Sequence, residues 1–99
     1  MTAITAGRRV YKYPLTFHPL QSVEMPYGAV VRHVHEQGGA PCLWVEVNTS
    51  APMVVNHFIV VATGQEVPVG ATYVGTVHVK WTVWHVFLLR DNGNEGARS

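Results

Sequence analysis

Residues 30–47 read VVRHVHEQGGAPCLWVEV, in which two runs of alternating apolar and polar side chains flank the pair Gly38-Gly39. A Gly-Gly pair suits a tight hairpin turn, because both central residues of a primed turn need positive φ angles. A symmetric turn of two residues places His35 opposite Cys42. The stretch therefore predicts a β-hairpin whose register is fixed by its turn.

That register sorts the hairpin into two faces, and a slip of one residue would scatter both sets. The core face is apolar except for Arg32 and Glu36, and it holds Val30, Val34, Leu43, Val45 and Val47. The opposite face combines imidazole, indole, thiol and carboxylate groups with one apolar side chain. It holds Val31, His33, His35, Cys42, Trp44 and Glu46. In this register His33 lies opposite Trp44. We interpret the second face as a candidate recognition surface.

The valine content extends the β pattern to the whole chain. Eighteen valines stand against five leucines, and β-branched side chains fit a pleated sheet better than a helix. Six prolines and nine glycines interrupt almost every stretch long enough for helical periodicity. We predict an all-β fold, a single small antiparallel β-sandwich or barrel-like meander of about six to seven strands. The expected strands are Arg9–Tyr13, Gln21–Glu24, Ala29–Gln37, Cys42–Asn48, Val54–Ala62, Thr72–Val79 and Thr82–Leu89.

A second hairpin is expected in residues 72–89, with Lys80-Trp81 as its turn of two residues, although this pair lacks the residues typical of such turns. One face of this hairpin would carry Val74, Thr76, His78, Val83, His85 and Phe87. The other face would carry Tyr73, Gly75, Val77, Trp84, Val86 and Leu88. In this register His78 and His85 are diagonal neighbours.

The length of 99 residues predicts a single domain, 1–99, with flexible termini at about 1–7 and 90–99, where apolar periodicity is absent. Seven basic and six acidic side chains give a net charge of +1, too small to hold extended nucleic acid. No apolar stretch approaches the length of a membrane span, and the sequence shows neither a signal peptide nor a disulfide partner for Cys42. We therefore expect a cytoplasmic protein that binds neither extended nucleic acid nor a membrane.

The polar and aromatic face of the first hairpin is the predicted ligand-binding site. Its members are His33, His35, Trp44 and Glu46, together with the cation of Arg32. An indole offers a flat surface for stacking and a guanidinium a bidentate partner for phosphate, although a Trp in a central strand is more often a core residue. Lys80 and Trp81 are predicted to contact a partner, because an apolar ring at a loop tip has no role in the core.

Enzymatic chemistry has weaker support. The spacing of His33, His35, Cys42 and Glu46 permits zinc, but structural zinc sites carry paired Cys-x-x-Cys units that this sequence lacks. Cys42 beside His35 would make a minimal thiolate nucleophile, yet a lone Cys next to Leu43 is typical of a buried apolar side chain. An acid–base pair of Glu46 and His33 has no further support. We predict no catalytic residues, no bound metal and no cofactor.

Six short segments follow one another along residues 11–89: KYPL at 12–15, MPYGA at 25–29, PCLW at 41–44, TG at 63–64, YVGT at 73–76 and WHVF at 84–87. In this order they resemble a family of small uncharacterised proteins of tailed phages and prophages, in which a histidine stands at the position of Gln65. The resemblance implies a phage origin and supplies no activity. Small non-structural phage proteins commonly act by occupying a host molecule, which favours binding over catalysis.

These features predict a non-catalytic intracellular binding protein. We expect a homo-oligomer that captures a host protein or a small anionic, nucleotide-like ligand, with a role in counter-defence. An oligomer would allow so small a domain to form a pocket between subunits. The alternatives are a virion structural or accessory protein and, with less support, a small hydrolase that depends on a metal or on Cys42 and His35.

Overall fold

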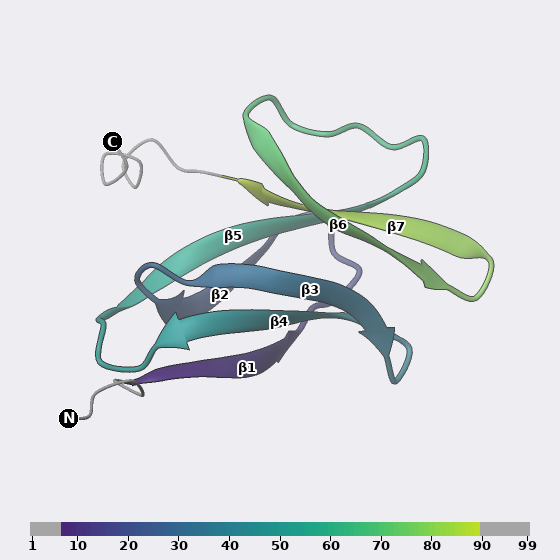
Figure 1. Ribbon diagram of the computed structural model, residues 1–99. Helices are drawn as coiled ribbons and strands as arrows, with labels where there is room; N and C mark the ends of the chain where they lie inside the picture. The colour runs from purple at the N-terminus through teal and green to yellow at the C-terminus, as the bar shows by residue number, and fades with distance from the viewer. Residues whose placement is uncertain (1–6, 90–99) are drawn as a thin grey trace.

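The β pattern of the sequence is realised in a computed structural model of the chain, which describes residues 7–89 (Figure 1). These residues form seven strands and no helix, which confirms the all-β prediction. The strands are β1 (Arg8–Pro14), β2 (Gln21–Pro26), β3 (Val30–Gln37), β4 (Ala40–Asn48), β5 (Met53–Ala62), β6 (Ala71–Val79) and β7 (Thr82–Leu89). Apart from Gly7, the termini with predicted flexibility lie outside the described residues. Nothing in residues 7–89 forms a helix that could cross a membrane.

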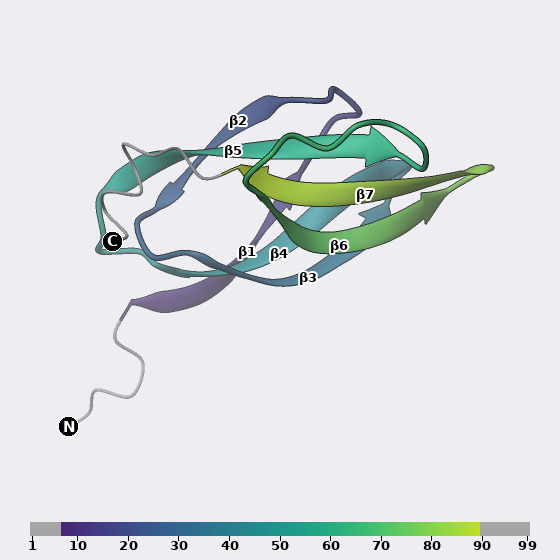
Figure 2. The same ribbon diagram turned by 90° about the horizontal axis from the view of Figure 1, so that it is seen from above.

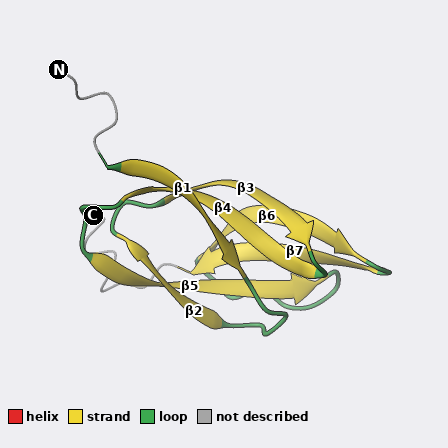
Figure 3. Cartoon of the chain, turned by 90° about the horizontal axis from the view of Figure 1, so that it is seen from below, coloured by secondary structure: helices red, strands yellow, loops and turns green. Residues whose placement is uncertain are grey.

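The seven strands form two antiparallel sheets that pack against each other (Figure 2, Figure 3). Sheet A has three strands in the order β1-β4-β3, and sheet B has four in the order β2-β5-β7-β6. The two sheets approach each other closely where β3 lies against β6. This arrangement is a small β-sandwich, one of the two architectures that the sequence predicts.

The core lies between the sheets, because alternate side chains of each strand point to the same side. Its fully buried members come from both sheets and from the segment after β1: Leu15, Met25, Leu43, Val45, Val47, Phe58, Val60 and Val86. The backbone N–H of Leu15 donates to the Pro41 carbonyl at 2.8 Å, and Pro14 pairs with Cys42. The KYPL and PCLW segments therefore lie side by side and close one end of the core.

The first hairpin keeps its predicted register only near the turn. From Gln37 back to His33 the pairing with β4 is as expected, and His35 lies opposite Cys42. A β-bulge at Arg32 then leaves that residue without a partner on β4 and shifts the register by one.

The bulge reverses the alternation of side chains before it. Val31 pairs with Val45 and packs against the core, whereas Val30 is 39% exposed on the outer side. The predicted core position of Val30 and the predicted outer position of Val31 are therefore wrong. Arg32, which the prediction placed on the core face, also points outward, since burying an unpaired guanidinium would cost several kcal/mol (on the order of 3–5).

The second hairpin also keeps its predicted register only near its turn. Its turn is at Lys80-Trp81 as predicted, with Lys80 in the left-handed region at φ 55°. A bulge at Val74 shifts the register, so that Tyr73 lies opposite Phe87 on the outer face and Val74 packs against the core. The predicted faces of Tyr73 and Val74 are therefore exchanged.

The connection between β5 and β6 crosses the outer side of sheet B. Both strands are antiparallel to β7, which lies between them, so residues 63–70 must run back across β7. Figure 1 shows this crossover loop arching over the side of sheet B that faces away from sheet A. On that side of β5, Ile59 and Val61 are buried, while Phe58 and Val60 fill the core on the other side. The middle of β5 is therefore covered on both faces.

Candidate functional site

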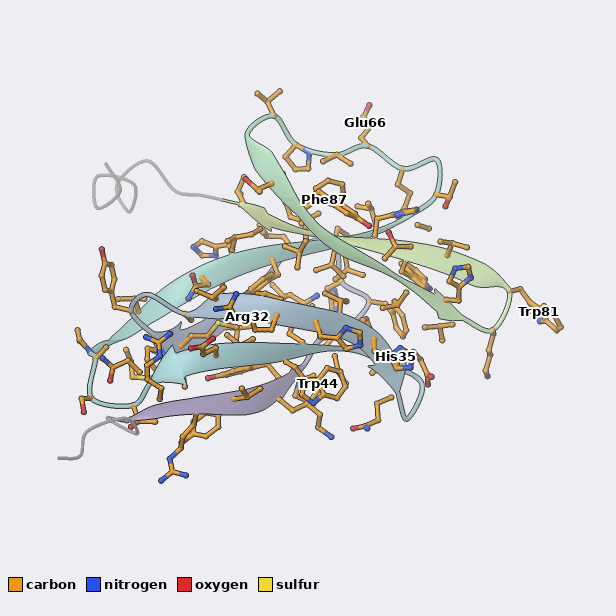
Figure 4. All side chains as sticks on the ribbon, viewed as in Figure 1. Arg32, His35, Trp44, Glu66, Trp81 and Phe87 are labelled. Carbon is orange, nitrogen blue, oxygen red and sulfur yellow. The ribbon has the colours of Figure 1, made fainter. Side chains whose placement is uncertain are left out.

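The outer face of sheet A carries all of the predicted ligand-binding residues. Pairing of β1 with β4 adds a third strand to the predicted hairpin and places Lys12 opposite Trp44. Figure 4 shows Arg32, His35 and Trp44 along the surface of β3 and β4. We define the outer face of sheet A by Arg8, Val10, Lys12, Val30, Arg32, His33, His35, Trp44 and Glu46.

Trp44 lies at the centre of this face and is half-buried. On one side, its ring centroid is 5.8 Å from that of His33, with an angle of 51° between the planes. The His35 ring lies 5.7 Å further along and is nearly parallel to that of His33, at 21°. On the other side is Lys12, whose Nζ donates a hydrogen bond across β4 to Oε1 of Gln37. The indole thus has aromatic neighbours on one flank and a cation on the other.

Glu46 fixes two guanidinium groups on the same face. Arg8 Nε donates to Oε2 at 2.9 Å, and Arg32 Nε donates to Oε1 at 2.8 Å. The hydrogen bonds from Arg8, and then from Arg32, hold the pKa of the Glu46 carboxyl below its ordinary value. Because Arg8 comes from β1 and Arg32 from the bulge in β3, the ionised carboxylate ties both outer strands of sheet A to β4.

The outer face of sheet A is net positive. It carries three cationic side chains, Arg8, Lys12 and Arg32, against the single carboxylate of Glu46. Each guanidinium retains N–H donors that Glu46 does not use, because an arginine has five. Val10, 58% exposed, adds apolar surface beside the ion pairs. Such a surface can stack a planar group and donate hydrogen bonds to an anion.

Cys42 has the predicted backbone position opposite His35, but its thiol is buried. Its Sγ lies 3.8 Å from the Ala40 carbonyl oxygen and 3.9 Å from that of Gln37, within the hairpin. A thiolate at this position has no access to a substrate on the outer face. Within residues 7–89, no group of three His, Cys, Asp or Glu side chains is placed to hold a metal ion.

Lys80 and Trp81 lie at the tip of the β6–β7 hairpin. Trp81 is 97% exposed, and Figure 4 shows it projecting beyond the end of the sheet, away from Trp44. The predicted partner contact and the predicted ligand-binding site are therefore separate surfaces.

A polar cluster that the sequence analysis missed lies on the outer face of sheet B. The Nδ1 atom of His85 is 3.1 Å from Oγ1 of Thr76, and its Nε2 is 2.8 Å from Oγ1 of Thr63. The Tyr73 hydroxyl lies 2.6 Å from Oγ1 of Thr76. The predicted turn does place His85 opposite Thr76. However, the bulge brings Tyr73 to this face and the crossover loop brings Thr63, and no local sequence pattern signals either event.

Comparisons with known proteins identify a family. No curated protein and no solved structure matches the chain. A family model described as a domain of unknown function, DUF7352, matches residues 6–97. The match spans both sheets, both hairpins and the crossover loop, so the chain belongs to the DUF7352 family.

Proposed function

We propose that this protein is a non-catalytic binding module that captures a small anionic ligand with a planar group, such as a nucleotide, on the outer face of sheet A. The observation that carries the proposal is the position of Trp44 between Lys12 and His33 on a net-positive face. A base would stack on the indole, and a phosphate would accept hydrogen bonds from the neighbouring cations.

The arginines of this face support the proposal because they are already ordered. Glu46 holds Arg8 and Arg32 in place, so binding costs little further side-chain entropy. Arg32 uses Nε and Nη2 toward Glu46, which leaves its remaining N–H groups for a phosphate. The buried thiol of Cys42 supports capture of a ligand without covalent chemistry.

The proposal is tested by titrating the ¹⁵N-labelled protein with adenosine monophosphate, adenosine and inorganic phosphate. We expect the nucleotide to bind more tightly than either part, with shifted signals at the Trp44 indole and His33. Trp44→Leu should weaken nucleotide binding by at least about fivefold, because a stacked aromatic contributes about 1–3 kcal/mol per base. An equal affinity for adenosine, or no shift at these residues, would contradict the proposal.

The matched control is Trp81→Leu, which removes another indole from a surface remote from Trp44. We expect this variant to bind the nucleotide as the wild type does. Lys12→Gln should weaken nucleotide binding while it leaves adenosine binding unchanged, because the ammonium group contacts only the anionic part.

A further inference from the structure

We propose that the hydroxyl oxygen of Tyr73 is a hydrogen-bond acceptor site for an organic cation with N–H donors, an ammonium or a guanidinium group. The site lies on the outer face of sheet B and is independent of the ligand-binding face proposed above. The acceptor role of the Tyr73 oxygen follows from the direction of the hydrogen bonds that link Tyr73, Thr76, His85 and Thr63.

We infer this direction from the carbonyl of Val83, because a carbonyl oxygen can only accept. We assign the Thr63 hydroxyl, 3.4 Å from this oxygen, as a donor to it, so that the Thr63 oxygen accepts the hydrogen bond from Nε2–H of His85 at 2.8 Å. In the neutral imidazole Nδ1 is then bare and accepts from the Thr76 hydroxyl. The Thr76 oxygen in turn accepts the proton of the Tyr73 hydroxyl.

The Tyr73 hydroxyl therefore donates its one proton to Thr76, and the lone pairs of its oxygen face the solvent as acceptors. Four linked bonds that all point the same way polarise one another, which strengthens the acceptor at the end of the chain. The Tyr73 side chain is 58% exposed, so a ligand can reach its oxygen. The Phe87 ring holds the Tyr73 ring from the side, with centroids 5.6 Å apart in an edge contact.

A cation at Tyr73 would meet no Lys or Arg side chain on the described strands of sheet B. Along the described strands of sheet B, the outer face carries the imidazoles of His57, His78 and His85 and, on the opposite edge strand from Tyr73, the carboxylate of Glu24, but no Lys or Arg side chain. The basic residue within this hairpin, Lys80, lies in its turn, at the far end from Tyr73. The exposed Tyr73 ring adds the negative electrostatic potential of its π face, which attracts ammonium and guanidinium groups.

The first test is the tautomer of His85. In the full chain labelled with ¹⁵N, at a pH at which the imidazole is neutral, we expect Nε2 to carry the proton and Nδ1 to be bare. A proton on Nδ1 would overturn the proposal, because the chain would then run outward and Tyr73 would be a donor. Thr76→Val should change the Nδ1 chemical shift, and Thr76→Ser, which restores a hydroxyl, should return it toward the wild-type value.

The second test is the binding of methylammonium, followed by NMR at Tyr73 and Phe87. Tyr73→Phe keeps the aromatic ring but removes the oxygen, and we expect it to weaken binding by at least about fivefold, the size expected for a hydrogen bond to a charged group. Tetramethylammonium, which has no N–H donor, should bind the wild type more weakly than methylammonium. Equal binding by Tyr73→Phe, or equal affinities for the two cations, would overturn the proposal.

The same experiment distinguishes a positioning role of Thr76 from a purely structural one. Thr76→Val should weaken methylammonium binding in the same sense as Tyr73→Phe, whereas Thr76→Ser should bind as the wild type does. If Thr76→Val fails to fold, the wild-type tautomer and the exposed Tyr73→Phe substitution still decide the proposal.

Discussion

Gly75 of β6 lies directly against Val34 of β3, at the point where the two sheets approach each other. A Cβ atom built on Gly75 would be 2.8 Å from Cγ2 and 2.9 Å from Cβ of Val34, closer than such atoms approach in folded proteins. Gly75 follows the bulge at Val74, and Val34 lies two residues beyond the bulge at Arg32. The missing side chain of Gly75 is therefore what allows β3 and β6 to pack at this distance.

Replacing Gly75 with alanine should destabilise the fold by about 1–3 kcal/mol, the usual cost of an added group in a packed interior. Val34 cannot move aside easily, because a β-branched side chain has few rotamers. Urea denaturation measures the effect. Val34→Ala in the same chain should recover part of the loss, so that the double variant is less destabilised than the sum of the two single variants. Additive effects would show that the two residues are not in steric conflict.

The ion pairs of Glu46 predict an acid-sensitive contribution to stability. The pKa of this carboxyl is lowered in the folded chain, mainly by hydrogen bonds from Arg8 and then Arg32, so ionised Glu46 favours the folded state. This contribution is present above the ordinary value of 4.5 and is lost as the pH falls through the lower, folded-state pKa. The difference in unfolding free energy between wild type and Glu46→Gln should therefore shrink as the pH falls below 4.5.

Glu24→Gln is the control for the Glu46 experiment. Within residues 7–89, the ion pairs seen involve Glu46 and not Glu24. We expect the stability difference between wild type and Glu24→Gln to change much less on acidification. Urea midpoints measured across the acidic range give these stability differences. A difference between wild type and Glu46→Gln that does not change with pH would contradict the prediction.

Trp81 at the hairpin tip should matter for association and not for folding. Because its ring is 97% exposed, Trp81→Ser should change the free energy of unfolding by less than about 0.5 kcal/mol. We expect the wild type to self-associate through this ring and the variant to shift toward the monomer, as measured by light scattering over a range of concentrations. A wild type that stays monomeric at high micromolar concentration would count against the predicted homo-oligomer.

The thiol of Cys42 should be inert in the folded protein, because only an accessible thiolate reacts. A coloured disulfide reagent should modify it no faster than the protein unfolds, and at once in concentrated urea. Cys42→Ala should cost about 1 kcal/mol of stability and leave nucleotide binding unchanged. Rapid modification of the native protein would contradict this prediction and would support the alternative in which the Cys42 thiolate is a nucleophile.

The sequence by itself determined the elements and the turns. Valine-rich alternation determined the all-β class, the pair Gly38-Gly39 marked the first hairpin turn, and the β-like runs on either side placed the second turn at Lys80-Trp81. The register followed correctly for several residues from each turn. These features depend on residues that are neighbours in the chain, so the Gly-Gly turn signal and the alternation of side chains are enough to predict them.

Only the tertiary structure decided where each register breaks and what lies beside it. At the bulge, Glu46 holds the Arg32 guanidinium outside the core, and β1 brings Arg8 to the same carboxylate. The contact of His85 with Thr63 depends on the crossover loop, and the contact of Tyr73 with Thr76 depends on the second bulge. A single extra residue in a strand reverses its faces, and packing between distant segments determines where that residue is accommodated.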